Sequence, residues 1–175
     1  MADFHQLIEQ QIPRLRRYAR ALTRNPERAD DLVQDTLVRA LAKQHFWQPG
    51  TNIRAWLFTL MHNQNVNTVR RAIREGVSVD LEELSSPLIA TSDPTESRKL
   101  FELERAIGEI PLKQRRVVLL VGLEGMSYAE TAAILDIPVG TVRSRLSRGR
   151  DALRRLMDVT PDAPLDTMPA LAQAA

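Results

Sequence analysis

The sequence predicts an all-α protein made of two small helical domains joined by a flexible linker. Three observations lead to this prediction. Apolar side chains recur near a 3.6-residue period over most of the 175 residues, as they do on the buried faces of helices. Helix-start signals such as Asn25–Pro26 precede several of these segments. A stretch without helical period, residues 76–95, separates residues 1–75 from residues 96–157.

The first domain, residues 1–75, is expected to contain three helices. Their predicted spans are Phe4–Thr23, Glu27–Gln44 and Ile53–Glu75. Asn25 is placed to cap the second helix, and Pro26 suits its first turn, where an N–H has no partner to lose. Residues His45–Asn52 contain the turn dipeptide Pro49–Gly50 and are predicted to form a loop.

The second domain, residues 96–157, is expected to contain four helices. Their predicted spans are Thr95–Ile110, Leu112–Leu123 and two short helices within Ser127–Met157. Residues 76–95 are rich in serine and threonine and are interpreted as a linker. Residues 158–175 contain three prolines and five alanines with no positive charge, so we expect a flexible tail.

The stretch Ser127–Met157 is typical of a helix-turn-helix. Ser127 and Glu130 match a capping box, Asp136–Ile137 marks the break, and Pro138 suits the first position of the next helix. One face of that helix carries an apolar stripe: Val142, Leu146, Gly149, Leu153 and Leu156. The opposite face carries Arg143, Ser144, Ser147, Arg148, Asp151 and Arg155. Since arginine and serine bind phosphates and base edges, we favour a helix that enters the major groove over an ordinary solvated face.

Two features of the first domain also indicate binding surfaces. The predicted second helix has an outward row that could meet a basic partner helix: Asp31, Gln34, Asp35 and Val38. Acids near a helix start also stabilise its positive end, but this explanation does not cover Asp35 and Val38.

The predicted third helix becomes polar and basic in its second half. The side chains concerned are His62, Asn63, Gln64, Asn65, Asn67, Thr68, Arg70, Arg71 and Arg74. Amides pair with base edges and arginines hold phosphates, so we favour nucleic-acid binding over a merely polar helix end. In the preceding loop, Phe46 and Trp47 either stack on unpaired bases or fold back into the core, and the sequence leaves both open.

Composition narrows the function classes. The chain has no cysteine and only three histidines, and no metal-ligand spacing, phosphate loop or nucleophile motif is present. The longest apolar run, Val117–Val121, is too short to cross a membrane, and no secretion signal opens the chain. We therefore expect a cytoplasmic, non-enzymatic protein with no cofactor, no metal and no membrane insertion.

Charge is distributed in blocks. Residues 1–80 have net charge +4, residues 81–110 net −4, residues 111–157 net +5 and residues 158–175 net −3. Two basic blocks separated by an acidic one suggest two polyanion-binding modules.

The order of these segments resembles a bacterial extracytoplasmic-function (ECF) sigma factor of the sigma-70 family. The resemblance spans roughly residues 5–157 and is carried by two blocks. ADDLVQDTLVRAL (29–41) with NIRAWLFTLMHN (52–63) is similar to sigma region 2, and the second block, 110–154, is similar to sigma region 4. Within that second block, PVGTVRSRLSRGR (138–150) is close to the family's usual wording.

The resemblance implies roles for the candidate residues. The implied partners are promoter DNA, an anti-sigma factor and core RNA polymerase, which would be bound through its β′ clamp helices and β subunit. The resemblance assigns docking on the clamp helices to Asp31, Gln34, Asp35 and Val38. It assigns binding and melting of the minus-ten element to Phe46, Trp47, Asn52, Asn63, Asn67, Arg70 and Arg71. It assigns contact with the minus-thirty-five element to Thr141, Arg143, Ser144, Ser147 and Arg148.

Two other functions are compatible with the sequence. A sigma mimic would sequester an anti-sigma factor without transcribing, although the DNA-reading residues are present. An ordinary helix-turn-helix regulator would bind an operator as a dimer, which leaves residues 1–75 without a role.

Overall fold

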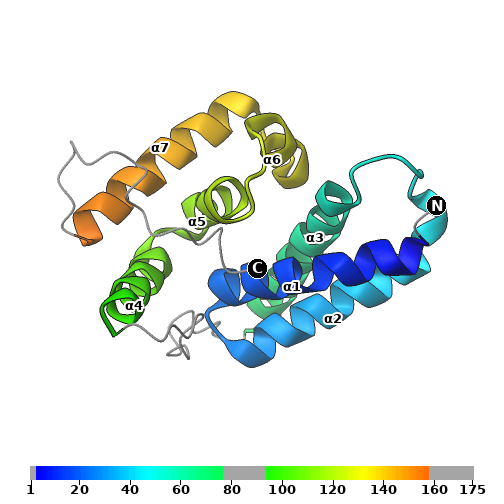
Figure 1. The fold of residues 1–175 in the computed structure, drawn as a ribbon, viewed down its shortest axis with the longest axis horizontal. Helices are drawn as coiled ribbons and strands as arrows, with labels where there is room; N and C mark the ends of the chain where they lie inside the picture. The colour runs from blue at the N-terminus through cyan, green and yellow to red at the C-terminus, as the bar shows by residue number, and fades with distance from the viewer. Residues whose placement is uncertain (1–2, 77–93, 158–175) are drawn as a thin grey trace. The chain divides into compact units, whose positions relative to one another are not determined.

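The computed structural model describes residues 3–76 and 94–157, and in these two ranges it contains helices and no strand. The elements are α1 (Phe4–Thr23), α2 (Pro26–Ala42), the 3-10 turn η1 (Gln44–Phe46), α3 (Ile53–Arg74), α4 (Pro94–Glu109), α5 (Leu112–Val118), the π-helical turn η2 (Leu119–Leu123), α6 (Tyr128–Leu135) and α7 (Val139–Leu156) (Figure 1). The all-α prediction is confirmed. The predicted linker, 76–95, lies almost entirely outside the described residues, and the predicted tail, 158–175, lies wholly outside them.

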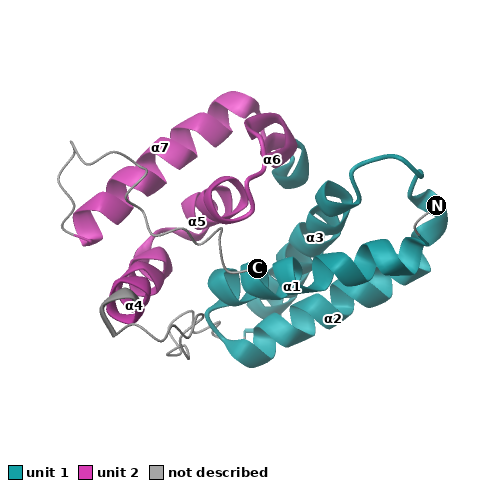
Figure 2. Cartoon of the chain, viewed as in Figure 1, with its two compact units in different colours: residues 1–84, 133–136 teal, residues 85–132, 137–175 magenta. Residues whose placement is uncertain are grey.

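The chain divides into two compact units (Figure 2). Unit 1 comprises residues 1–84 and 133–136, and unit 2 comprises residues 85–132 and 137–175. The domain limits drawn from the sequence stay a prediction. Across the described ranges, no helix is both long and apolar enough to cross a bilayer.

The core of unit 1 lies between α1, α2 and α3, which pack against one another. Leu15 of α1 and both Leu57 and Met61 of α3 are fully buried. The rings of Tyr18 and Phe58 meet edge to face with centroids 5.1 Å apart, a geometry that adds to the area they bury. The helix-start prediction is confirmed, because the Asn25 side chain accepts a hydrogen bond from Arg28 N–H at 2.9 Å.

The core of unit 2 lies where α7 packs against α4 and α5. Val142, Leu146, Gly149 and Leu153 are buried as the predicted stripe requires, but Leu156 is 44% exposed. Leu156 is the last residue of α7, so its side chain extends past the region of packing. Gly149 allows α7 to lie close to α5, because a Cβ built at this position would lie 2.6 Å from Val118 Cγ2.

The segment predicted as one helix over Leu112–Leu123 changes its winding after Val118. In η2 the backbone widens, and Glu124 N–H bonds to the carbonyl of Leu119, five residues earlier, at 3.0 Å. Gly125 follows with a φ of 64°, a conformation that glycine adopts without steric cost. Helical periodicity does not distinguish such a π turn from an α-helix, because it occupies a single turn.

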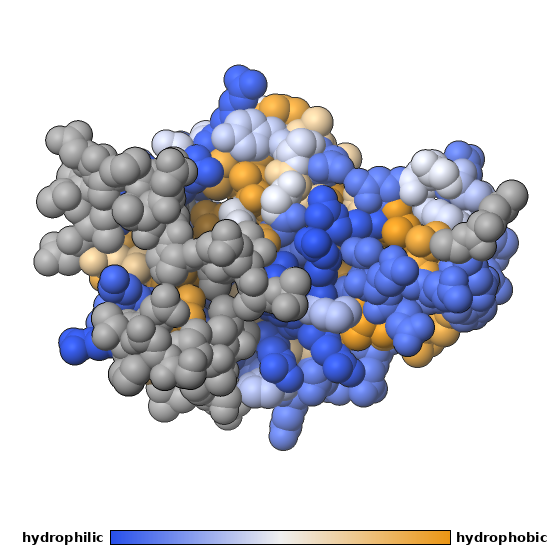
Figure 3. Space-filling model, in the orientation of Figure 1, coloured by the Kyte–Doolittle hydropathy of each residue, from blue (hydrophilic) through white to orange (hydrophobic). Residues whose placement is uncertain are grey.

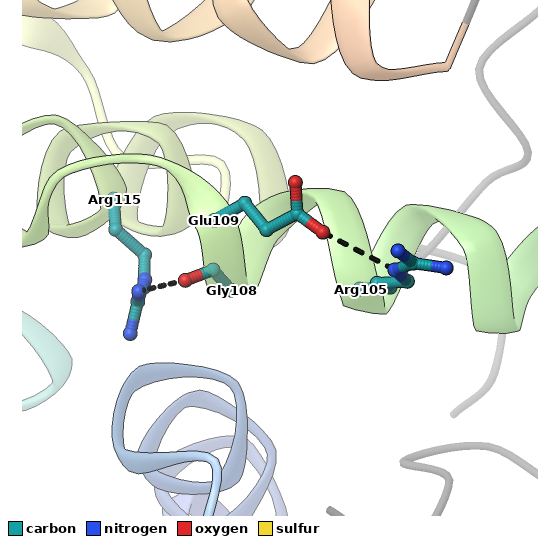
Figure 4. Close-up of polar contacts among 4 residues, drawn as sticks. All are labelled: Arg105, Gly108, Glu109 and Arg115. Atoms are coloured by element: carbon teal, nitrogen blue, oxygen red, sulfur yellow. Dashed lines mark hydrogen bonds and ion pairs between the residues drawn. The ribbon is translucent and has the colours of Figure 1, made fainter. Parts of the chain in front are cut away.

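A buried arginine joins α4 to α5. Arg115 is 5% exposed, and its guanidinium donates to the carbonyls of Ile107 at 2.9 Å and Ile110 at 3.2 Å. It also donates to the Gly108 carbonyl, beside the exposed Arg105–Glu109 ion pair (Figure 4). The last carbonyls of a helix have no partner within it, so Arg115 satisfies the end of α4.

Candidate nucleic-acid interface

Local hydrogen bonds define both the start of α6 and the turn that joins it to α7. Ser127 N–H donates to Glu130 Oε2 at 2.8 Å, and Glu130 N–H donates to Ser127 Oγ at 3.1 Å. This reciprocal pair is the predicted capping box. Asp136 adopts a left-handed φ of 53°, and Ile137 N–H reaches back to the Ala132 carbonyl at 3.1 Å. These are the features of a Schellman motif, which stops a helix sharply.

α7 begins at Val139 rather than at Pro138. Pro138 has a ψ of 147° and is the N-cap, one position before the predicted one. Its carbonyl accepts the first bonds of the helix, from Thr141 N–H at 2.9 Å and Val142 N–H at 3.1 Å. The short turn therefore sets where the arginine-rich helix α7 begins.

The outward face of α7 is exposed as the sequence predicts. Arg143, Ser144, Ser147 and Arg148 are exposed, and Thr141 is half-buried. Neither Arg143 nor Arg148 forms an ion pair with a described residue, whereas Arg154 bonds to Asp151 at 3.0 Å. A guanidinium without an acidic partner can bind a phosphate or guanine without first breaking an ion pair.

Ser144 is oriented by the helix itself. Its hydroxyl donates to the Thr141 carbonyl at 3.1 Å. The hydroxyl hydrogen is thereby engaged, and the oxygen lone pairs remain available to accept a hydrogen bond. In this conformation Ser144 presents an acceptor, which suits an amino group on a base edge.

The second half of α3 forms another polar, basic surface. Asn63, Asn67, Arg70 and Arg71 are exposed. Asn67 and Arg70 line a hollow together with Ile73 and Arg74. Spacing of three and four residues places all of these on one side of the helix.

Ion pairing distinguishes the arginines of α3. Arg71 Nε donates to Glu75 Oε1 at 2.8 Å, and this hydrogen bond raises the pKa of Arg71 above its ordinary value. Arg70 and Arg74 have no ion pair with a described residue. Ile73 is 67% exposed on this surface and was not among the predicted residues. It follows Arg70 by three residues and directly precedes Arg74, and this spacing is the sequence signal that indicates it.

The two aromatic residues of the loop before α3, whose roles the sequence left open, have different environments. Trp47 folds back, with its ring centroid 5.3 Å from that of Phe4. Phe46 is 69% exposed and lies against the His45 ring with centroids 4.2 Å apart. Asn52 caps α3 by accepting from Ala55 N–H at 3.1 Å. Phe46 is therefore the aromatic ring of this loop that has a face available to a base.

The outward row of α2 is exposed throughout: Asp31, Gln34, Asp35 and Val38. Val38 is 68% exposed, and Asp35 Oδ2 accepts a hydrogen bond from Gln64 Nε2 of α3 at 3.0 Å. On the face drawn in Figure 3, unit 1 shows mainly hydrophilic residues with smaller hydrophobic patches between them. A lone exposed apolar side chain is ordinary, but one within a row of acids suits a mixed contact with a partner.

Two family models match the chain. Residues 8–62 match the model described as the Sigma2 domain of PhyR, and residues 100–153 match Sigma-70, region 4. The first match covers most of α1, all of α2 and the first half of α3. The second runs from α4 into α7, so both candidate surfaces lie on or beside a matched segment.

Similar full-length proteins align across both segments. The ECF RNA polymerase sigma factor EcfG of Rhodopseudomonas palustris is 40% identical over 148 residues, which cover 85% of this chain and 81% of that protein. The ECF RNA polymerase sigma factor SigE of Mycolicibacterium smegmatis is 34% identical over 88% of this chain and 61% of its own length.

A solved structure also matches. The sigma factor RpoE of Bartonella quintana, crystallised with the anti-sigma factor NepR, superposes with a TM-score of 0.77 at 35% identity. That match covers 91% of this chain and 99% of RpoE. Sequence and fold thus agree on the same group of relatives.

Proposed function

We propose that this chain, which belongs to the extracytoplasmic-function sigma factors of the sigma-70 family, binds core RNA polymerase and directs it to promoters. The observation that carries this proposal is the 40% identity to an ECF sigma factor across both helical units, from unit 1 into α7. An isolated helix-turn-helix regulator would share only the second segment.

In this proposal α7 reads the minus-thirty-five element as duplex DNA. Arg143 and Arg148 bind phosphates or guanine edges, and Ser144 and Ser147 contribute shorter contacts with Thr141 beside them. Support comes from the exposure of this face and from arginines that no described acid neutralises.

The minus-ten element is assigned to unit 1. Phe46 stacks on an extruded base, and the α3 surface binds the separated strand through Asn63, Asn67, Arg70 and Arg71. Asn52 holds the start of α3, and Trp47 anchors the loop on Phe4. Unstacking a base costs a few kcal/mol, which its capture on an aromatic ring offsets.

Docking on polymerase is assigned to the α2 row of Asp31, Gln34, Asp35 and Val38. Its carboxylates suit the basic side chains of a partner helix, and Val38 provides the apolar contact. The polymerase supplies the chemistry of RNA synthesis, so this chain provides binding and no catalytic step. We place its action in the cytoplasm, where that partner works.

An anti-sigma factor is the proposed regulator. The similar RpoE was crystallised with the anti-sigma factor NepR. A protein of that kind would hold this chain away from polymerase by covering its docking and DNA-binding surfaces.

Run-off transcription tests the main proposal. Core polymerase with this chain should initiate at two-element promoters of the source genome, and core polymerase alone should not. Asp35→Arg should abolish core binding, while Lys99→Arg on exposed α4 is the matched control that retains it. Absence of transcript from every candidate promoter would refute the proposal.

A sigma mimic is the second candidate, favoured by one observation. The family model that matches residues 8–62 is described as the Sigma2 domain of PhyR, and a solved complex names PhyR an anti-anti-sigma factor. Such a mimic would bind an anti-sigma factor but would yield no transcript with core polymerase, so the same assay separates the two functions.

A further inference from the structure

One hydrogen bond joins the row on α2 to the amide-rich part of α3. Gln64 Nε2 donates to Asp35 Oδ2 at 3.0 Å, between residues 29 positions apart in the chain. Asp35 is exposed on α2, and Gln64 is half-buried on α3. Since α2 and α3 pack together within unit 1, the bond spans the line along which the two helices meet.

The surroundings hold the Gln64 amide in one orientation. Its Oε1 is shielded from solvent and accepts no hydrogen bond from a described residue. Reversing the amide would bring that oxygen against the Asp35 carboxylate, so the nitrogen must face Asp35. A shielded acceptor without a partner is unfavourable, and the charge-assisted bond from Nε2 to Asp35 compensates for it.

The bond leaves Asp35 able to bind a second partner. A carboxylate has about four lone-pair sites, and one donor occupies only one of them. Asp35 is exposed, so a guanidinium or ammonium can approach its other positions while Gln64 keeps the group in place. Val38, three residues further along α2, is 68% exposed on the same side.

We propose that Gln64 is a positioning residue for polymerase docking, whose amide holds the Asp35 carboxylate in the orientation that the basic partner surface meets. The inference rests on the proposed function, in which the α2 row binds core polymerase. An exposed aspartate otherwise samples several rotamers, and restricting them before association removes part of the ordering cost. One of the two Nε2 hydrogens of Gln64 is bonded to Asp35 and its Oε1 is shielded from solvent, so Gln64 is not assigned to base reading.

A double-mutant cycle tests this role. The full-length chain is titrated with core polymerase as wild type, Gln64→Ala, Asp35→Ala and the double variant. Gln64→Ala should weaken core binding about threefold to tenfold, as expected for one net hydrogen bond. In the double variant, the loss should equal that of Asp35→Ala alone, because the amide then has no carboxylate to orient.

Two controls separate positioning from a general structural role. Gln10→Ala removes an exposed amide from α1 of the same unit and should leave core affinity unchanged. Asp31→Ala should weaken binding by a factor that multiplies with that of Gln64→Ala, because Asp31 receives no bond from Gln64. The thermal midpoint of Gln64→Ala should match that of wild type.

Three results would overturn the inference. They are core affinity of Gln64→Ala within twofold of wild type, losses that multiply in the Asp35 cycle, or a defect confined to promoter opening. If Asp35→Ala itself binds core polymerase like wild type, the docking surface of the proposed function is wrong as well. Each of the three results named first leaves the docking surface unaffected. Failure of this inference can therefore be told apart from failure of the proposed function.

Discussion

Gly149→Ala should destabilise unit 2, although alanine is the better helix former. Replacing glycine by alanine inside a helix ordinarily stabilises it by about 0.8–1 kcal/mol. Here the new methyl group would lie 2.6 Å from Val118 Cγ2 and 3.6 Å from Gln114 Cβ. The first distance is far below a normal carbon contact of about 3.5–4.0 Å.

The clash should outweigh the gain in helix propensity. Val118 is buried and lies in α5, where a β-branched side chain has one strongly preferred rotamer and cannot turn away. Overpacking a core costs about 1–3 kcal/mol. Subtracting the propensity gain leaves a net destabilisation of about 1 kcal/mol, which corresponds to about 4–8 °C in Tm for a domain of this size.

Far-UV circular dichroism during urea and thermal unfolding measures the effect. Gly140→Ala is the matched control, because Gly140 lies in the first turn of α7 and a Cβ added there would meet nothing within 4 Å, so this variant should be slightly stabilised. Gly149→Ala combined with Val118→Ala should recover part of the cost of overpacking. Equal stabilisation by both single glycine substitutions would refute the argument from close packing.

Three further predictions concern other parts of the chain. Arg115→Met should lower the free energy of unfolding by about 1–3 kcal/mol in urea titrations, since the final α4 carbonyls lose their donor; unchanged stability would contradict the capping role. Arg148→Ala should make the salt dependence of holoenzyme binding to promoter DNA shallower by about one counterion in a fluorescence titration, while Lys99→Ala should leave the slope unchanged. Phe46→Ala should retain the wild-type Tm and lose promoter opening in a permanganate assay, whereas Trp47→Ala should lower the Tm, and the reverse pattern would reject the assignment.

Local features account for the predictions that agree with the structure. The span Phe4–Thr23 is recovered at both ends, and the capping box of Ser127 and Glu130 forms with both of its bonds. These features depend on side chains three or four residues apart, whose geometry the helix itself dictates. The exposed arginine face of α7 follows in the same way from helical spacing.

The differences arise where local pattern is insensitive. Apolar spacing predicts that Leu156 lies on the buried stripe of α7, but it is 44% exposed, because it is the last residue of that helix. The π turn after Val118 and the position of Pro138 are changes of one residue in winding or in helix start. Apolar periodicity and proline preference do not resolve such changes.

By itself the sequence determined the helical segments, the caps at Asn25 and Ser127, the arginine-rich outer face of α7 and the family to which the chain belongs, since each depends on residues close together or on their order along the chain. Only the tertiary structure decided that Trp47 turns inward while Phe46 stays exposed, that Arg115 closes the end of α4, that Gly149 admits Val118, and that Gln64 meets Asp35. Those contacts join side chains on separate elements, and their distances depend on how helices pack rather than on the spacing of residues along one of them.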